Sequence, residues 1–295
     1  MYTGAVIIAA GPNCAPLAPA GNICVAQRMI AAFQKAGVNV FAVITGPEDK
    51  KLEKQLTQPG VIFLHNPAPE NLDASIKLGL ESLREKCSKI FLLEANRPVL
   101  SPDTLEKLSR EQGDVIIPTY ESEEGRPILL SQYAVVYLSK HPFSALPKSN
   151  LQLCYIPVND PGVLLSPSEI CGDADALSDH DRKLTRPVVG VSITRGRNLL
   201  DDKLMMLLFQ IQQTQSVRVA CSRMQISYST AWNILNNAEE ELGYPLLKRN
   251  KGGPSGSGSL LTQKGQELLD AYEQFQFVAK QKMEKLYDTY LAGIL

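Results

Sequence analysis

Residues 4–11 read GAVIIAAG, an apolar run that ends at Gly11 and is followed by the turn-forming pair Pro12 and Asn13. A run of this length with turn residues at its end predicts a buried strand and its exit loop. Residues 25–36 then carry apolar side chains near helical spacing and stop before a glycine, and residues 38–44 form a second apolar run. The order of strand, helix and strand predicts a β-α-β unit.

The same alternation continues through the first two-thirds of the chain. We expect further strands at residues 61–64, 89–94 and 114–118, and helices at residues 72–86 and 102–111. Strands that alternate with helices predict an α/β domain with a doubly wound, mostly parallel sheet. Ligands of such sheets bind outside the carboxyl ends of the strands.

The chain has 295 residues, about twice the common size of one domain, so we expect two domains. Hydrophobic residues make up 44% and charged residues 21%, a globular composition that excludes a mostly disordered, collagen-like or coiled-coil chain. The alternating pattern stops after residue 184, and a basic connector follows at residues 195–197. We therefore predict one domain at residues 1–195 and a second at residues 196–295.

Charge and cysteine usage exclude several classes of protein. The 30 basic and 31 acidic residues leave a formal charge of -1, so any surface that binds DNA must be local. No stretch approaches the ~18 apolar residues of a membrane span, and the N-terminus lacks a basic segment, which predicts a cytoplasmic protein without a membrane partner. Six cysteines without a C-x-x-C pair and three scattered histidines predict reduced thiols and no metal site.

The last third of the chain has a different pattern. We expect helices at residues 199–213, 216–224 and 228–242, with a tight turn at residues 225–227 between the second and third. A hairpin with a tip at residues 250–259, too glycine-rich to pack, precedes a long helix that starts at residue 262. Helix, turn, helix and a two-stranded wing predict a mainly α winged helix-turn-helix, whose second helix enters the major groove.

The residues in this region carry a family resemblance. Residues 216–236 read SVRVACSRMQISYSTAWNILN, with an Ile-Ser-Tyr turn and an Ala-Trp pair, and are followed by LLKR at residues 246–249 and LTQKGQ at residues 261–266. These ordered landmarks resemble the DNA-binding domain of the ModE-type molybdate-responsive transcription regulators, which is related to the LysR-type domain. The resemblance implies a partner, double-stranded DNA, and a link to molybdenum or molybdenum-cofactor metabolism.

The side chains of this region divide into two roles. Hydroxyls at the start of the recognition helix approach base edges closely, and asparagines three residues apart on one face can pair with adenine. Basic residues at the wing offer charge to phosphates. The alternative interpretations are a solvated helix face and a solvated loop. We predict as DNA-binding residues Arg218, Arg223, Ser227, Tyr228, Ser229, Thr230, Asn233, Asn236, Lys248, Arg249 and Lys251.

Two further expectations concern this region. The family often has a lysine at the position of Ser229, so DNA affinity is expected to be lower or to depend more on Arg218, Arg223 and the wing. The last helix carries too many apolar and aromatic residues to pack on one small domain alone. Because palindromic operators are read by two-fold dimers, we expect a homodimer whose contact includes this helix and residues 204–211.

The first two-thirds resembles another family. VIIAAG at residues 6–11, Asn66 with Ser75 and Ile76, the strand that ends in ANRP at residues 95–98, and GRP at residues 125–127 are similar to elements of the MobA-like and MocA-like molybdenum-cofactor nucleotidyltransferases. The resemblance implies a nucleotidyltransferase fold whose first loop receives a triphosphate on its backbone amides. It places ligand-binding residues at Ala10, Gly11, Asn13, Ser75 and Asn96.

Departures from this family decide the prediction about catalysis. Nucleotidyl transfer requires a metal held by carboxylates and cations that neutralise phosphate charge. The family's loop of Gly-x-Ser-x-Arg-Met-Gly-x-x-Lys is shortened here to GPNCAP at residues 11–16, Asn96 replaces the aspartate of Gly-Asp-x-Pro, and the late acidic segment reads SPSE at residues 166–169. We therefore predict no catalytic residue and no catalytic metal.

The interpretation that follows is a pseudoenzyme domain that senses a ligand for an attached DNA reader. A nucleotide or a molybdopterin-type molecule is the expected ligand, although the residues leave its identity unknown. Three alternatives stay open. The domain could be an inert dimerisation scaffold, the chain could be an active, divergent cytidylyl- or guanylyltransferase that regulates its own synthesis, or it could be a protein-interaction module with a vestigial helix-turn-helix.

Overall fold

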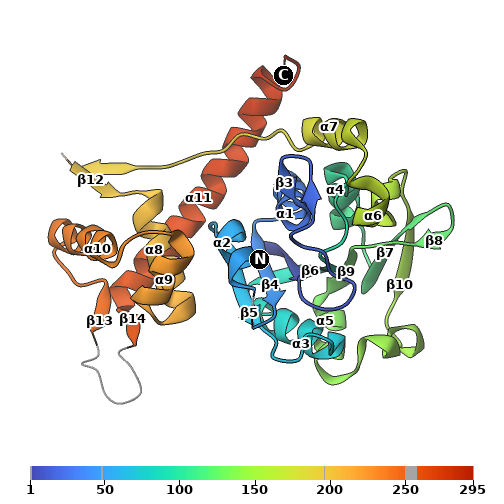
Figure 1. Ribbon diagram of the computed structural model, residues 1–295, viewed down its shortest axis with the longest axis horizontal. Coiled ribbons are helices and arrows are strands. Elements are labelled where there is room, and N and C mark those ends of the chain that lie inside the picture. Colours follow the sequence, from blue (N-terminus) through green and yellow to red (C-terminus); the bar gives the residue numbers. More distant parts are fainter. Residues whose placement is uncertain (1, 48, 196, 250–257, 295) are drawn as a thin grey trace. The chain divides into compact units, whose positions relative to one another are not determined.

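The computed structural model describes residues 2–47, 49–195, 197–249 and 258–294 (Figure 1). The chain divides into two compact units, one of Met1–Leu56 with Gly60–Thr185 and the other of Thr57–Pro59 with Arg186–Leu295. The predicted boundary at 195/196 falls inside the second unit, between the paired strands β11 (Ile193–Arg195) and β12 (Arg197–Leu200).

The first unit is built on an eight-stranded mixed sheet. The strands run in the order β10-β7-β9-β6-β1-β4-β5, with β8 paired to β7, and β9 lies antiparallel to both of its neighbours while the pairs β1–β4, β1–β6, β4–β5 and β7–β10 are parallel. The predicted α/β fold with a mostly parallel sheet is confirmed. The strands are β1 (Tyr2–Ile8), β4 (Val40–Thr45), β5 (Val61–His65), β6 (Cys87–Glu94), β7 (Val115–Tyr120), β8 (Glu123–Glu124), β9 (Ile128–Ser131) and β10 (Leu153–Pro157).

Helices cover both faces of this sheet (Figure 1). The helices are α1 (Val25–Lys35), α2 (Lys50–Leu56), α3 (Leu72–Leu83), α4 (Pro102–Arg110), α5 (Gln132–Lys140), α6 (Pro167–Ile170) and α7 (Ala174–Lys183), with 3-10 turns η1 (Phe143–Lys148) and η2 (Pro161–Val163) and a small hairpin of β2 (Pro19–Ala20) and β3 (Ile23–Cys24). Side chains of β1 alternate between two cores. Ala5 and Ile7 pack in one and Val6 and Ile8 in the other, which explains the continuous apolar run of this strand.

The helix α7 is attached to the rest of the first unit by a buried arginine. Arg28 of α1 is fully buried, donates from Nε and Nη2 to the Ala20 carbonyl, and donates from Nη1 to the Leu177 carbonyl. The same Nη1 lies 3.1 Å from His180 Nδ1 and 2.8 Å from Asp181 Oδ1. These contacts hold the last helix of the first unit to its first helix.

Among its described residues, the second unit contains the pair of β11 and β12, three short helices, a two-stranded wing of β13 and β14, and one long helix. The elements are α8 (Asp202–Thr214), α9 (Val217–Met224), α10 (Tyr228–Leu242), β13 (Leu247–Arg249), β14 (Ser259–Leu261) and α11 (Gln263–Tyr290). Gln215 and Gln225 adopt left-handed backbone conformations, with φ of 52° and 56°, and end α8 and α9. Residues 250–257, which include the predicted wing residue Lys251, lie outside the described residues.

One predicted helix begins later than expected. Residues 199 and 200 belong to β12, and α8 starts only at Asp202. The Asp201 carboxylate accepts a hydrogen bond of 2.8 Å from the Leu204 amide and so caps the helix at this point. The apolar pair before the cap fits a helix face and a strand equally well, so hydrophobic spacing alone did not separate them.

The base of the wing is attached on two sides. Glu239 of α10 accepts hydrogen bonds from the amides of Leu246 and Leu247, at 2.7 and 3.2 Å. Thr262 caps α11 and donates to the Pro245 carbonyl. A side chain at Gly265 would place its Cβ 2.5 Å from the Leu246 carbonyl oxygen, which explains why the Leu-Thr-x-x-Gly sequence ends in glycine.

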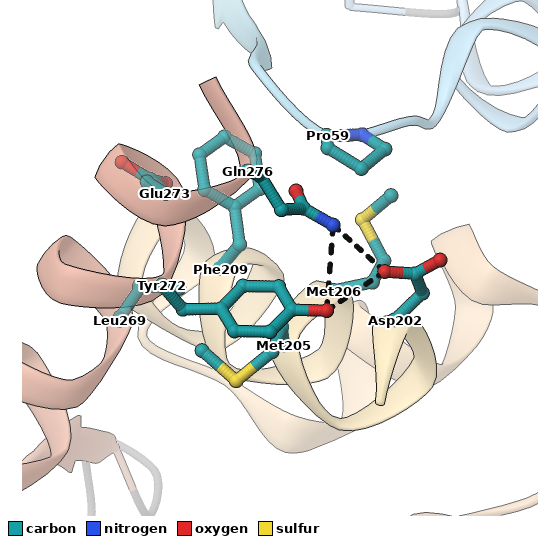
Figure 2. Close-up of a pocket in the computed structure, with 9 residues that line it drawn as sticks. All are labelled: Pro59, Asp202, Met205, Met206, Phe209, Leu269, Tyr272, Glu273 and Gln276. Atoms are coloured by element: carbon teal, nitrogen blue, oxygen red, sulfur yellow. Dashed lines mark hydrogen bonds between the residues drawn. The ribbon is translucent and has the colours of Figure 1, made fainter. Parts of the chain in front are cut away.

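The segment that enters the second unit is bound to α11. The Tyr272 hydroxyl lies 2.7 Å from the Val191 carbonyl oxygen and 2.9 Å from Asp202 Oδ1. Figure 2 shows that the Gln276 amide donates to the same carboxylate, at 2.7 Å. Burial and the Asp202 carboxylate raise the pKa of Tyr272, so the phenol stays protonated. A cavity of only about 20 Å³ adjoins this cluster between α8 and α11.

Even α11, with 28 residues, is not apolar enough to cross a membrane, and neither is any other helix in the described ranges.

Candidate functional site

The turn between α9 and α10 orients the predicted recognition helix. The amide of Ile226 donates to the Cys221 carbonyl at 3.1 Å, after Gln225 has reversed the chain in its left-handed conformation. Ser227 then caps α10, because its Oγ accepts the Thr230 amide at 3.0 Å. The same Oγ lies 2.9 Å from Ser229 Oγ and 2.7 Å from Thr230 Oγ1. The Ser227 hydroxyl thus caps the helix, and its contact with DNA stays a prediction.

Opposite faces of α10 differ in burial. Ala231, Leu235 and Ala238 are buried, at the spacing of four and three residues that a helix needs to present one face to a core. The predicted DNA-binding residues of this helix are all exposed: Tyr228, Ser229, Thr230, Asn233 and Asn236. Trp232 is half-buried and packs edge-to-face on Tyr228, with ring centroids 6.0 Å apart.

Charge varies along this helix. Its first turn contains no acidic residue, whereas its last turn contains Glu239, Glu240 and Glu241. The partial positive charge of a helix N-terminus attracts phosphate, and carboxylates repel it. The N-terminal half of α10 is therefore the part that a nucleic acid can approach.

The predicted basic residues do not all reach this surface. Arg218 of α9 and Lys248 of β13 are exposed, and Arg249 is the last residue of β13. Arg223 is only 8% exposed, and its Nη1 donates to Gln210 Oε1 of α8 at 3.4 Å. The structure thus places Arg223 inside the unit, because the buried amide of Gln210 needs a polar partner there.

In the first unit, the loops after β1 and β6 meet at the carboxyl ends of their strands. The Ala95 amide donates to the Ile8 carbonyl at 2.7 Å, and the Ala15 amide donates to the Ala95 carbonyl at 3.1 Å. A cleft of about 500 Å³ opens beside these loops. Its lining comprises Pro12, Asn13, Cys14, Ala15, Glu94, Asn96, Arg97, Ser166, Pro167 and Ser168.

The predicted ligand-binding residues of this unit separate into two groups. Asn13 and Asn96 line the cleft, and the Asn96 amide donates to the Asn13 carbonyl at 3.0 Å. Ala10 and Gly11 precede Asn13 in the loop after β1, and Gly11 has a φ of 130° that favours glycine. Ser75 is fully buried and accepts a hydrogen bond of 2.8 Å from Asn66, so the structure does not bring it into the cleft.

Sequence reasoning missed Arg97, which lines this cleft, and Arg126, whose backbone contacts the same carbonyl group as Arg97. Arg97 Nε donates to the Val163 carbonyl at 3.1 Å, and the backbone amide of Arg126 donates to the same oxygen at 2.9 Å. Burial lowers the pKa of both guanidiniums, and the charge of Arg126 lowers the pKa of Arg97 further. The available signal was their position, since both stand beside prolines in the segments that resemble the nucleotidyltransferases.

The donor groups of the cleft do not fit the metal site that the nucleotidyltransferase resemblance implies. Glu94 supplies a carboxylate to the lining, but the second position holds Asn96, whose amide is already bonded to Asn13. Within the described ranges, no group of three or more His, Cys, Asp or Glu side chains is arranged to hold a metal ion.

Comparisons with known families agree with these two regions. Residues 11–148 match the family model of the MobA-like NTP transferase domain, and residues 202–266 match that of the bacterial regulatory helix-turn-helix proteins of the lysR family. Both expected resemblances are confirmed, and the two matching regions are called the MobA-like domain and the LysR-type helix-turn-helix.

The curated relatives match about a third of this chain. The transcriptional regulator ModE of Haemophilus influenzae is 34% identical over 89 residues, which is 30% of this chain and 35% of that protein. The DNA-binding transcriptional dual regulator ModE of Escherichia coli K12 is 28% identical over 88 residues, 30% of this chain and 34% of that protein. The chain thus spans about a third of the length of the curated relatives it matches.

Among solved structures, a nucleotidyl transferase from Methanothermobacter thermautotroptrophicus superposes with a TM-score of 0.49 and 21% identity. The superposition covers 62% of this chain and 98% of that one.

Proposed function

We propose that this chain is a DNA-binding transcription regulator whose MobA-like domain recognises a small ligand and does not transfer nucleotides. The observation that carries the DNA-binding part is the exposed N-terminal half of α10, with Asn233 on its surface and the cations Arg218 and Lys248 on neighbouring elements. Asparagine can pair with adenine in two places, and basic side chains bind phosphates without reading sequence. The match of residues 202–266 to the lysR-family helix-turn-helix model and the similarity of 30% of the chain to proteins named as transcriptional regulators support this proposal.

The experiment that tests DNA binding is a selection of the full-length protein on a pool of random DNA duplexes, followed by equilibrium binding at several salt concentrations. We expect one sequence family to be enriched and bound more tightly than random DNA. If the DNA affinity falls with salt but the selection enriches no sequence, the protein is not a sequence-specific regulator. That result would favour the interpretation as an interaction module with a vestigial helix-turn-helix.

Two properties support the proposal that the MobA-like domain senses a ligand: its cleft is large enough for one, and residues that nucleotidyl transfer requires are missing. A nucleotide or a molybdopterin-type molecule fits the size of the cleft. The loop at residues 11–16 carries no lysine or arginine, and Asn96 stands where the nucleotidyltransferases have an aspartate. A ligand that binds the folded protein should raise its melting temperature in a thermal-shift screen with nucleotides, pterins and molybdate.

The alternative is an active molybdenum-cofactor cytidylyl- or guanylyltransferase with an attached DNA reader. Glu94, a carboxylate in the cleft, is the observation in its favour. Incubation with CTP or GTP, Mg²⁺ and molybdopterin distinguishes the two functions. Sustained pyrophosphate release that a Glu94→Gln substitution abolishes would establish that the domain is an enzyme. If the protein binds the ligand but releases no pyrophosphate, the result supports a ligand-sensing domain.

We also infer that the regulator acts as a homodimer through α11. Phe275, Leu286 and Tyr290 are 50%, 49% and 68% exposed, and their spacing places them on one face of that helix. A second copy of the chain is the occupant that a two-fold operator requires. The apolar residues at 204–211 of α8, which we expected in the same contact, are already buried within the unit, apart from the half-buried Met206, and are left out of this proposal.

Sedimentation equilibrium of the full chain tests the dimer. A Leu286→Glu substitution should shift the protein toward the monomer, whereas Gln281→Glu on the exposed surface of the same helix serves as the control for added charge. A wild-type protein that stays monomeric at micromolar concentration would contradict the dimer.

A further inference from the structure

An aromatic pair lies on the N-terminal half of α10. Tyr228 is 53% exposed, and its ring packs edge-to-face on the half-buried Trp232, with ring centroids 6.0 Å apart. The two residues are four positions apart, so they form one row along the helix surface. Such a contact favours one orientation of the Tyr228 ring. The ring is therefore held in place on one side and open to a binding partner on the other.

The hydroxyl groups at the start of α10 are bonded mainly to one another. Ser227 Oγ accepts the Thr230 amide and forms further hydrogen bonds with Ser229 Oγ and Thr230 Oγ1. The two bonds between hydroxyls use two of their three protons inside the helix cap. The side chains of the first turn thus offer a base mainly acceptor oxygens and the apolar ring of Tyr228.

A second row of side chains runs beside the aromatic pair. Ser229 and Asn233 are also four positions apart, and both are exposed. Ser229 precedes Trp232 by three residues, so the two rows are neighbours on the helix surface. The first turn of α10 contains no acidic residue that would repel DNA. This half of the helix therefore presents an aromatic ring and a side-chain amide side by side.

An A·T base pair offers two neighbouring features of the same kind in the major groove. Adenine presents N7 and N6 to an amide such as that of Asn233, and thymine presents its C5-methyl group to an apolar side chain. We propose that α10 reads A·T base pairs, with Tyr228 in contact with a thymine methyl group and Trp232 as the positioning residue of the Tyr228 ring. This inference rests on the proposed DNA-binding function and adds the class of base pair that the helix recognises.

Replacement of thymine by uracil tests the methyl contact, because deoxyuridine lacks only the C5-methyl group. Fluorescence anisotropy of the full chain compares the DNA sequence enriched in the selection with duplexes in which each of its thymines is replaced in turn. We expect at least one replacement to weaken binding by about fourfold, the effect of removing one methyl group from an apolar contact. Low salt keeps weakly binding variants measurable.

Variants of Tyr228 connect this effect to the ring. Tyr228→Ala should bind the thymine and uracil duplexes alike, whereas Tyr228→Phe, which keeps the ring and lacks the hydroxyl, should keep the preference for thymine. Tyr133→Ala is the matched control, because it removes a tyrosine that is 79% exposed in the first unit. Circular dichroism checks folding, and Tyr228→Gln replaces an alanine variant that unfolds.

Variants of Trp232 test the positioning role. Trp232→Leu should reduce the preference for thymine to less than about twofold, with little change in affinity for the uracil duplex, since it removes the aromatic contact of Tyr228. Trp232→Phe keeps a ring and should restore the preference. Equal weakening on both duplexes would assign Trp232 a structural role only and overturn its positioning role. Trp232→Met takes the place of a leucine variant that unfolds.

Three results would overturn the methyl contact: no uracil replacement in the enriched sequence weakens binding, folded Tyr228→Ala keeps the preference for thymine, or Tyr228→Phe loses it, which would assign the contact to the hydroxyl. An enriched sequence without a methyl effect overturns this inference alone and leaves the regulator in place. If the selection enriches no sequence, the regulator and this inference both fail.

Discussion

The recognition helix and the cleft hold their candidate functional residues in different ways. Asn233 stands on the exposed face of one regular helix, and the structural tasks around it are done by other residues, the cap by Ser227 and the core contact by Leu235. In the cleft, Asn96 and Arg97 are themselves bonded to backbone groups of distant loops. A substitution on the helix surface should therefore change binding alone, whereas a substitution in the cleft changes binding and loop structure together.

The largest expected effect comes from Gly265, which packs closely against the Leu246 carbonyl at the base of the wing. Gly265→Ala would place a Cβ 2.5 Å from the Leu246 carbonyl, so the backbone at the base of the wing must shift. We expect a loss of about 2–4 kcal/mol in the unfolding free energy of the second unit and a loss of DNA binding. Differential scanning calorimetry measures the first effect.

Gly293→Ala is the control for Gly265, because a Cβ at this position meets no atom within 4 Å. An unchanged melting temperature in Gly265→Ala would show that the wing base tolerates the added methyl group. Ligand binding by the MobA-like domain should be unchanged in both variants.

The next effect tests the assignment of base recognition to α10. Asn233→Ala should weaken binding to the selected DNA by about 1–3 kcal/mol and change binding to random DNA little. Fluorescence anisotropy with both duplexes measures the difference. Asn150→Ala, which removes an exposed amide from the first unit, should have no effect on either. Equal weakening on both duplexes would place Asn233 against the DNA backbone.

A pH effect on stability tests the attachment of α7 in the first unit. His180 is buried, its Nε2 lies 2.8 Å from the Leu100 carbonyl oxygen, and its Nδ1 faces Arg28, so the ring is held neutral. Burial lowers the pKa of His180, against the attraction of Asp160 and with the repulsion of Arg28 and Lys183. The same Arg28 also pairs with Asp181 of α7.

The direction of this pH effect depends on whether the folded or the unfolded chain binds a proton at His180 at the higher pH. The unfolded chain protonates this histidine near pH 6.5 and the folded chain only at lower pH, so the unfolding free energy falls as pH drops below about 6.5. We expect a loss of up to about 1.4 kcal/mol per pH unit in urea titrations of the first unit. His180→Gln should reduce this dependence, and the exposed His141→Gln should leave it unchanged. A flat profile in the wild type would contradict a neutral, buried His180.

The smallest expected effect concerns the wing. Lys248→Ala should weaken binding to all DNA sequences alike and lower the slope of log affinity against log salt by about one unit. The sequence alone leads us to expect the same of Arg249→Ala. Lys50→Ala on the exposed surface of α2 is the control. If Lys248→Ala binds like the wild type at low salt, the wing is a solvated loop and does not contact phosphate.

Local signals explain what the sequence could predict. The third helix of the second unit was predicted at residues 228–242 and lies there, because its cap Ser227 and its terminal Gly243 are adjacent to it in the chain. The antiparallel strand β9 was not predicted, because its place between β6 and β7 depends on pairing with segments far away in sequence. The predicted fold class was nevertheless confirmed, since it depends on the order of elements and not on every pairing.

In the candidate sites too, local patterns were predictable from the sequence and long-range contacts were not. Helical periodicity predicted the exposed face of α10 correctly as far as burial is concerned. It did not reveal that Arg223 turns inward, because the partner amide of Gln210 belongs to another helix. The meeting of Arg97 and Arg126 at Val163 joins three segments that no spacing rule connects. Side chains that act through long-range backbone contacts become visible only in the folded chain.

The bond between Tyr272 and the Val191 carbonyl bears on how the two units can be studied apart. Residues 186–191 belong to the second unit, so a cut at 195/196 would remove the carbonyl acceptor of this bond and leave the phenol with Asp202 and Gln276. A cut between Thr185 and Arg186 keeps the segment with its helix. An isolated DNA reader should therefore be expressed from residue 186, and the shorter version is expected to lose part of its stability before any DNA is added.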